Sequence, residues 1–312
     1  MTILVCGSLA FDNIMVFHDK FKNHIMPDQI HILNVSFLVP TMRKEYGGCA
    51  GNISYNLKLL GADVIPMATV GQDFTPYAEW LINNDIKQNA IKLLENNYTG
   101  QAFITTDEDD NQITAFHPGA MGESHQNHVS DVSGIEIGIV SPDGKEGMIQ
   151  HAQEFADANI PFLFDPGQGL PMFDADELKA FINQATWLAV NDYESKLIQD
   201  KTGWSLEKIS KKVEAIFVTK GHTGSVIYHD DSTINIPVCK ADNPTDPTGC
   251  GDAYRAGLLY GLVNDLDLKT TGQIASLLGA IKVEKNGTQN HKFTKSEFEK
   301  RYFSQFKQQI NL

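Results

Sequence analysis

The chain has 312 residues, of which 42% are hydrophobic and 21% are charged, so it can form a substantial core and does not have the composition of a disordered protein. It carries 25 Lys and Arg against 39 Asp and Glu, and the formal net charge of −14 argues against a nucleic-acid or membrane-surface partner. A small anionic ligand stays open, because local backbone dipoles can outweigh a distant net charge.

The chain begins with a short apolar run, Ile3–Cys6, which ends at Gly7 and predicts the first strand of a parallel sheet. It lacks the basic stretch of a signal peptide, and no apolar run approaches the roughly 20 residues of a membrane span. We therefore expect a cytoplasmic protein. The cysteines form no CxxC pair, which disfavours a zinc site or a redox dithiol: Cys6, Cys49, Cys239 and Cys250.

A carboxylate and a glycine-rich turn near the N-terminus are candidates for binding hydroxyl groups. Asp12 comes shortly after the first strand, where α/β folds place ligands, and its oxygens could accept hydrogen bonds from neighbouring hydroxyls. Gly47 and Gly48 allow a close backbone approach to a ligand, and Asn52 could bond a diol. Taken alone, each has a structural alternative, with Asp12 as a helix or turn cap and Asn52 as the cap of a helix predicted from 52 to 60.

Two regions suggest a small β element outside a parallel sheet. Residues 14–46 contain Pro27 and Pro40 and no long helical period, and 30–37 partly alternates, so we expect short strands there. Residues 98–117 contain two strand-like runs, Tyr98–Thr106 and Gln112–Phe116. They are joined by a polar, acidic turn without the ligand spacing of a calcium loop, which we interpret as a solvated hairpin turn.

The rest of the chain alternates between strands and helices, which indicates a mostly parallel sheet covered by helices in one α/β domain over residues 1–312. Predicted strands are Val64–Val70, Ile135–Val140, Phe162–Phe164, Trp187–Val190, Ala215–Thr219 and Ser225–Tyr228. Predicted helices are Ala78–Asn83, 145–158, 174–185, 205–213, 270–284 and 294–309.

Two polar motifs follow predicted strands of this sheet. Asn191 and Glu194 are one helical turn apart and could bind Mg²⁺ through water, although the same pattern is typical of an N-terminal helix cap. Thr219, Gly221 and Gly224 form a strand end and a glycine loop. That loop is compatible with nucleotide phosphates and equally with a plain hairpin turn.

The most informative segment is Asp246-Pro247-Thr248-Gly249-Cys250-Gly251-Asp252, which runs directly into an apolar helix over 253–262. A glycine turn at a helix N-terminus exposes backbone N–H groups and the positive end of the helix dipole, which suits an anion such as phosphate. A carboxylate at that place would repel phosphate unless it had a role. Asp252 could accept the proton of a hydroxyl that attacks the phosphate.

Other catalytic patterns are missing from the sequence. There is no Walker A loop, no GxGxxG after the first strand, no HExxH and no GxSxG, which disfavours a P-loop enzyme, an ordinary dinucleotide dehydrogenase, a zinc protease and a serine hydrolase. The motifs that are present, taken in order, resemble over nearly the whole chain the ribokinase/adenosine-kinase family of PfkB-type sugar and nucleoside kinases. The anchors are Gly47-Gly48 with Asn52, Asn191 with Glu194, Thr219-x-Gly221 and 246–252.

Within that family the chain is most similar to archaeal and bacterial nucleoside kinases, in segments 105–114, 164–168 and 252–257. It departs from the usual D-T-x-G-A-G-D pattern at Pro247, which has no N–H to donate, and at Cys250, which is still small. The resemblance implies a ribokinase-like three-layer α/β/α fold with a mostly parallel central sheet. It also implies a small β-sheet lid, formed here from about 14–46 and 98–117.

The resemblance further implies transfer of the γ-phosphate of ATP to the 5′-hydroxyl of a ribonucleoside, most naturally adenosine. Asp252 would be the base, and the N–H groups of Gly249, Cys250 and Gly251 would stabilise the transferring phosphoryl. The resemblance also implies that the ribose is bound by Asp12, Gly47, Gly48 and Asn52, and that the lid contacts the base through Phe116, beside Phe103 and His117. It implies that ATP is bound by Asn191, Thr219, Gly221 and Gly224, and Mg²⁺ by Glu194.

Some family members also bind K⁺ beside this turn, and the resemblance puts Asp246 and the 285–287 loop near such an ion. Two other functions stay open, namely a sugar kinase acting on ribose or a related sugar and a catalytically silent nucleoside-sensing protein. The expected partners are a nucleoside and ATP, with no nucleic acid and no membrane. An open lid edge could pair with a second copy, so both a monomer and a lid-mediated homodimer are compatible with the sequence.

Overall fold

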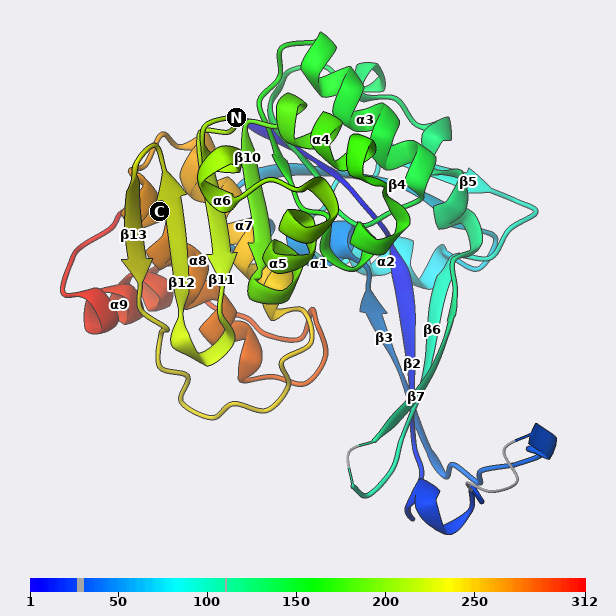
Figure 1. Cartoon of the computed structure of the whole chain (residues 1–312). Helices are drawn as coiled ribbons and strands as arrows, with labels where there is room; N and C mark the ends of the chain where they lie inside the picture. The colour runs from blue at the N-terminus through cyan, green and yellow to red at the C-terminus, as the bar shows by residue number, and fades with distance from the viewer. Residues whose placement is uncertain (27–30, 110) are drawn as a thin grey trace.

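The computed structural model of the chain describes residues 1–26, 31–109 and 111–312. Its main sheet contains β1 (Thr2–Cys6), β4 (Asp63–Gly71), β5 (Ala90–Leu94), β8 (Ile135–Val140), β9 (Phe162–Phe164), β10 (Trp187–Asn191), β11 (Ala215–Thr219), β12 (Ser225–His229) and β13 (Ser232–Ile236). The strand order is β13-β12-β11-β10-β9-β8-β1-β4-β5 (Figure 1). The pairs β11–β12 and β12–β13 are antiparallel and the others are parallel, as predicted for a mostly parallel sheet.

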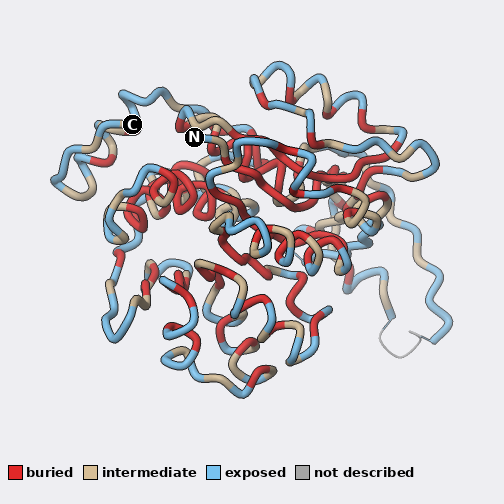
Figure 2. Tube along the Cα trace, turned by 90° about the horizontal axis from the view of Figure 1, so that it is seen from above, coloured by how far each residue is buried: buried red, intermediate tan, exposed pale blue. Residues whose placement is uncertain are grey.

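Helices cover both faces of this sheet, which gives the predicted three layers. One core cluster is built with α1 (Cys49–Leu59), α7 (Cys250–Val263), α8 (Leu268–Val283) and α9 (Lys295–Phe306). The other is built with α3 (Lys145–Asp157), α4 (Ala175–Gln184), α5 (Asp192–Thr202) and α6 (Leu206–Ser210). Seen from above, the buried residues gather along the sheet and on the helix sides that face it (Figure 2). Within the described ranges, every helix is too short or too polar to cross a bilayer.

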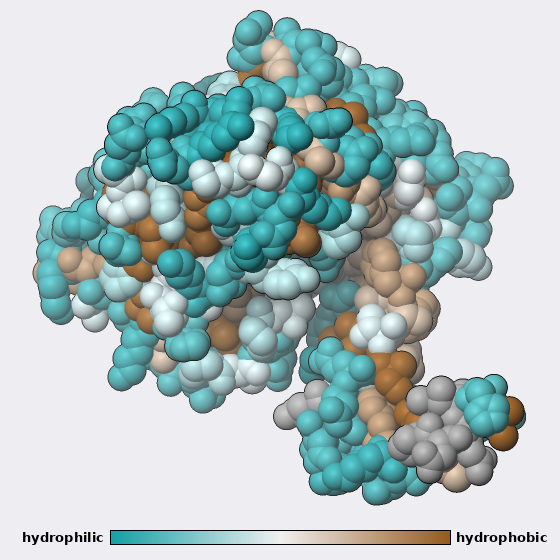
Figure 3. Space-filling view, viewed as in Figure 1, coloured by the Kyte–Doolittle hydropathy of each residue, from teal (hydrophilic) through white to brown (hydrophobic). Residues whose placement is uncertain are grey.

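A second, smaller sheet extends away from this body (Figure 1). It has the order β3-β2-β6-β7 and consists of β2 (Ala10–Val16), β3 (Thr41–Gly47), β6 (Gly100–Thr106) and β7 (Gln112–His117). Strand β2 begins at Ala10, four residues before the expected limit of 14. Figure 3 shows hydrophobic residues gathered on this projection, and its exposed members include Met42, Phe103, Ile113 and Phe116.

The sequence predicts a strand around 30–37, and this prediction is wrong for 31–37, which forms no ladder. Phe37 instead packs against Phe17 and Phe21 in an aromatic cluster at the end of the small sheet. Pro27 and Ile30 lie outside the described residues, as does Asp110 of the acidic turn.

The acidic turn is held together rather than simply solvated. Asp107 is 5% exposed and accepts N–H bonds from Phe21, Asp109 and Asn111. A buried carboxylate that accepts backbone hydrogen bonds closes the hairpin between β6 and β7.

The order of the main sheet locates the expected ligand cleft. The chain moves from β1 to β4 and β5 on one side, whereas β8 to β13 extend on the other side. Ligands of open α/β sheets bind outside the carboxyl ends of the strands at such a reversal, here between β1 and β8.

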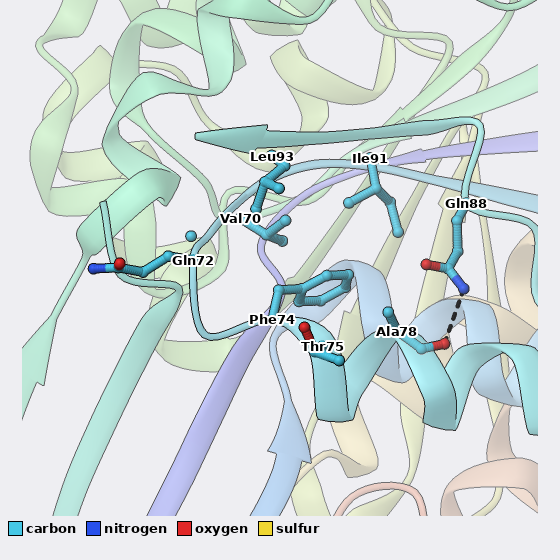
Figure 4. Close-up of a pocket in the computed structure, with 9 residues that line it drawn as sticks. Val70, Gln72, Phe74, Thr75, Ala78, Gln88, Ile91 and Leu93 are labelled. Carbon is cyan, nitrogen blue, oxygen red and sulfur yellow. Dashed lines mark hydrogen bonds between the residues drawn. The ribbon is translucent and has the colours of Figure 1, made fainter. Parts of the chain in front are cut away.

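A small pocket of about 250 Å³ lies elsewhere, between β5 and α2 (Thr75–Asn83) (Figure 4). Its walls include Val70, Phe74, Ile91 and Leu93, and the side-chain amide of Gln88 donates to the carbonyl of Ala78. Its lining residues have no titratable side chain, so it offers no group for acid–base chemistry.

Candidate active site

A cleft of about 1450 Å³ runs along the carboxyl ends of the central strands. Five polar residues line it at or just after strand ends, and they come from β1, β8, β9, β10 and β11 in turn: Ser8, Asp143, Asp165, Asn191 and Thr219. The volume exceeds the roughly 300–1000 Å³ of a pocket for one small ligand, so two ligands can lie end to end. The residues predicted for catalysis, ribose, ATP and Mg²⁺ all line this cleft except Gly47, whereas the expected lid contacts Phe103 and His117 do not line it.

The first glycine turn places α1 against the end of β1. Gly48 has φ +85, and a Cβ there would lie 2.5 Å from the carbonyl oxygen of Ser8. Only glycine combines this backbone conformation with such a close approach. The turn therefore brings Asn52, in the first turns of α1, to the wall of the cleft, where it is 4% exposed.

The second glycine turn presents free N–H groups to the cleft. Gly249 has φ +78 and precedes α7 as its N-cap. The N–H of Thr248 donates to Asp246 Oδ1 at 2.9 Å, and the N–H of Cys250 donates to the carbonyl of Pro247 at 3.1 Å. The N–H groups of Gly249 and Gly251 have no hydrogen-bond partner among the described residues, so these two are available to an anion.

The two turns meet through Asp252. Asn52 Nδ2 donates to Asp252 Oδ2 at 2.8 Å, and Asn52 Oδ1 accepts from Gln289 at 3.0 Å. Gln289 also donates to Tyr77, whose hydroxyl donates to the carbonyl of Gly47. Burial raises the pKa of Asp252 to about 6, against the opposing hydrogen bond from Asn52. The carboxyl is therefore mostly ionised at neutral pH yet basic enough to take a proton.

Asp12 lies on β2, where this strand pairs with β3. A Cβ at Gly47 would lie 2.7 Å from Asp12 Oδ2, so Gly47 lies directly behind the Asp12 carboxyl and leaves room for it. Burial, followed by the charge of Glu45, raises the pKa of Asp12 to about 6. Gly47 thus does not line the cleft itself, but its lack of a side chain leaves the space that the Asp12 carboxyl occupies.

A buried ion-pair cluster lies near Asp252, and its central residue, Arg255, has no role predicted from the sequence. Arg255, 5% exposed, donates from Nη2 to Asp165 Oδ1 at 2.9 Å, and the same nitrogen lies 3.7 Å from Glu194 Oε2. Its charge lowers the pKa values of Asp252 and Glu194, in both cases against the larger effect of burial, which raises them. Arg255 lies one helical turn after Asp252 in α7, a spacing that the sequence shows but that does not reveal its buried partners.

The Asn191 and Glu194 pair forms the helix cap that was the alternative interpretation. Asn191 Oδ1 accepts the N–H of Glu194 at 2.7 Å, and Glu194 Oε2 accepts the N–H of Asn191 at 2.8 Å. Both residues also line the cleft. Across the described parts of the chain, no three His, Cys, Asp or Glu side chains are grouped to hold a metal ion. A cation at Glu194 and Asp165 would therefore be bound through water or phosphate.

The far end of the cleft is more apolar and suits a flat, largely apolar group. Thr219, Gly221 and Gly224 line it together with residues of the 238–244 segment and α8, including Val238, Ala241, Pro244 and Ala280. A Cβ at Gly224, which has φ +94, would overlap the carbonyl of Ile236, so this loop also requires glycine.

The small sheet contributes one face to the cleft. Ala102 and Ile104 of β6 and Thr114 and Phe116 of β7 line it. Because successive side chains of a strand point to opposite faces, Phe103 and His117 lie on the other side of the small sheet and do not line the cleft, contrary to the expected lid contacts.

Known proteins resemble this chain in both sequence and fold. The model of the pfkB family of carbohydrate kinases matches residues 12–295. A nucleoside kinase of Methanocaldococcus jannaschii is 35% identical over 260 residues, which are 83% of this chain and 85% of that protein. Burkholderia thailandensis nucleoside kinase in complex with inosine is 49% identical with a TM-score of 0.90, over 98% of this chain and 99% of that one. Its structure in complex with ADP-inosine is 50% identical with a TM-score of 0.88, over 99% and 97%.

Proposed function

Since the chain belongs to the pfkB family of carbohydrate kinases and is a phosphotransferase with an alcohol acceptor, we propose that it transfers the γ-phosphate of ATP to the 5′-hydroxyl of a ribonucleoside. The observation that carries this proposal is the position of Asp252. Its carboxyl lies in the first turn of α7, after the free N–H groups of Gly249 and Gly251 and beside Asn52.

The polar part of the cleft suits a ribose. Asp12 accepts hydrogen bonds from ribose hydroxyls, and Gly48 and Asn52 hold the sugar so that its 5′-oxygen faces Asp252. Phe116 and Ile104 of the small sheet then contact the base. Enclosing the base between this sheet and the body makes the sheet a lid that excludes water from the reaction.

In the chemical step the 5′-oxygen forms a bond to the γ-phosphorus while the bond from that phosphorus to the β,γ-bridging oxygen breaks. The leaving electron pair stays on ADP, and the proton of the 5′-hydroxyl moves to Asp252. The N–H groups of Gly249 and Gly251 hold the negative charge of the transferring phosphoryl, an interaction worth about 3 kcal/mol per donor in comparable sites. The Cys250 N–H does not take part in this role because it already donates to the carbonyl oxygen of Pro247.

The phosphate end of the cleft is organised by Arg255. It fixes Asp165 and Glu194, and Mg²⁺ bound near them through water would supply positive charge to the phosphates of ATP. Asn191 holds the Glu194 carboxylate in place through the helix cap, and Thr219, Gly221 and Gly224 line the nucleotide end.

The acceptor is tested by measuring ATP turnover with adenosine, inosine, guanosine, cytidine and ribose, using a reaction without acceptor as the blank. We expect turnover with purine nucleosides. Adenosine is the acceptor expected from the sequence, and inosine is the ligand bound in the Burkholderia relative, so the rates with these two are compared directly. A rate with ribose above that with every nucleoside would favour the sugar kinase. Tight nucleoside binding without any turnover would favour a nucleoside sensor.

A further inference from the structure

A lysine is completely buried behind the second glycine turn. Lys282, in the last turn of α8, is 0% exposed. Its Nζ donates to the carbonyl oxygen of Asp246 at 2.8 Å and to that of Lys285 at 3.0 Å. Lysine is almost never fully buried unless its charge is paired, so these carbonyl oxygens are the partners that make its burial tolerable.

The two carbonyls belong to the segments that shape the turn. Asp246 begins the 246–252 segment, and its carboxylate accepts the N–H groups of Thr248 and Gly287, each at 2.9 Å. Thr288 follows Gly287 and packs on the turn. A Cβ at Gly249 would lie only 3.0 Å from Thr288 Cγ2, which shows how close the two are. The ammonium therefore ties together the backbone that sets the position of the Gly249 N–H.

The surroundings of Lys282 act on its charge in both directions. Asp246 favours the charged form of Lys282, whereas burial is the larger effect and lowers the pKa of Lys282. The charge of this ammonium lowers the pKa of Cys250 against the larger effect of burial, and it lowers the pKa of His291 further than burial alone does. One positive charge held by carbonyl oxygens beside a carboxylate is the environment that a bound alkali ion would otherwise require.

The resemblance to the kinase family placed a K⁺ site at Asp246 and the 285–287 loop, and the residues present do not fit a free ion there. An alkali ion is coordinated by carbonyl oxygens that replace its hydration shell. Here the carbonyls of Asp246 and Lys285 already accept N–H bonds from Lys282. Because an ammonium group resembles K⁺ in charge and size, the two would compete for the same oxygens.

We propose that the Lys282 ammonium permanently takes the place of a monovalent cation behind the glycine turn, so that phosphoryl transfer by this chain does not depend on K⁺. Lys282 is a positioning residue: it acts through the backbone at Asp246 and Lys285 and does not touch the substrate. The activity readout of this proposal rests on the proposed kinase function.

The first test compares the turnover of the wild-type chain in potassium chloride and in tetramethylammonium chloride at equal ionic strength. Tetramethylammonium is too large for a carbonyl site and has no N–H to donate. The wild-type chain is expected to turn over equally in both salts. Strong activation of the wild-type chain by K⁺ would overturn the proposal, whatever the variants do.

The second test exchanges the internal cation for an external one. Lys282→Ala leaves room for an ion, and in tetramethylammonium it should lose about tenfold or more in kcat through the displaced turn and recover in K⁺. Lys282→Met removes the charge but fills the space, so it should be slow in both salts. Lys269→Ala, an exposed lysine on the same helix, is the matched control and should behave as the wild-type chain. Full activity of Lys282→Met in tetramethylammonium would contradict the proposal.

A measurement without turnover separates this proposal from the kinase function. K⁺ that binds the folded Lys282→Ala variant should raise its melting temperature above that in tetramethylammonium, and the wild-type chain should show no such difference. If no nucleoside is phosphorylated by the wild-type chain, the proposed function fails, while these melting temperatures still decide the role of Lys282. Equal melting temperatures of Lys282→Ala in both salts would contradict that role.

Discussion

Asn52 donates a 2.8 Å hydrogen bond to Asp252 although 200 residues separate the two in sequence. This contact joins the glycine turn before α1 to the glycine turn before α7. The pair therefore links the residues proposed to bind the ribose with the residues proposed to bind the phosphoryl group.

Asn52→Ala should lower kcat and raise the KM for the nucleoside together. The change removes both the donor to Asp252 and a proposed ribose contact, and we expect kcat to fall by about 10–100-fold. Steady-state kinetics measure this. Asn264→Ala removes a 2.8 Å bond to Tyr260 at the other end of α7 and is the control, which should leave both constants unchanged. A normal kcat in Asn52→Ala would show that the Asn52–Asp252 bond does not orient the base.

The pH dependence of kcat/KM should follow the ionisation of the cleft carboxyls. Asp252 and Asp12 both have a pKa raised by burial to about 6, and both act in the ionised form. Protonation therefore removes activity as the pH falls through about 6, and activity is retained above it. Because kcat/KM reports the free enzyme, its pH profile is the measurement. Activity that stayed constant down to pH 4.5 would contradict these roles.

Gly47→Ala should weaken nucleoside binding without unfolding the chain. Its Cβ would lie 2.7 Å from Asp12 Oδ2, so the Asp12 carboxyl must move from its position. The expected result is a raised nucleoside KM with an almost unchanged KM for ATP. A Cβ at Gly122 would have nothing within 4 Å, which makes Gly122→Ala the matched control for the glycine replacement itself. Equal effects of the two substitutions would count against the role of Asp12.

The sequence identified the two glycine turns and the residues after the strands because each is encoded by neighbouring residues. It could not identify Arg255 or Lys282, because their burial depends on partners from other elements, such as Asp165 for Arg255 and Asp246 for Lys282. In the sequence, Lys282 looks like an ordinary surface lysine near a helix C-terminus.

Dependence on partners from other elements also explains the strand that was predicted wrongly and the two strands that were not predicted. Residues 31–37 only partly alternate in hydrophobicity, and Phe37 packs into an aromatic cluster with Phe17 and Phe21 instead of a ladder. The short strands β5 and β13 form the two edges of the main sheet and were not predicted. An edge strand is stabilised by pairing on one side only, so its sequence carries a weaker pattern.

Arg255→Leu should destabilise the fold strongly. It leaves the Asp165 and Glu194 carboxylates buried without their cation, which typically costs about 3–5 kcal/mol. Urea unfolding measures the loss. The double variant Asp165→Asn/Arg255→Leu should lose less than the sum of the single changes, because one unpaired charge is removed. Lys196→Ala, which breaks an exposed ion pair with Asp200, should change stability little. Strict additivity in the double variant would contradict the buried pair.

The central claim is that Asp252 is the base of a phosphoryl transfer, and the most direct measurement of it is the kcat of Asp252→Asn with its nucleoside affinity measured separately. Asparagine keeps the size of the side chain and an oxygen that can still accept the Asn52 bond, but it cannot take the substrate proton. The expected result is a fall in kcat of about 10²–10⁴-fold with nucleoside binding almost unchanged. A variant with near-normal kcat would contradict the assignment.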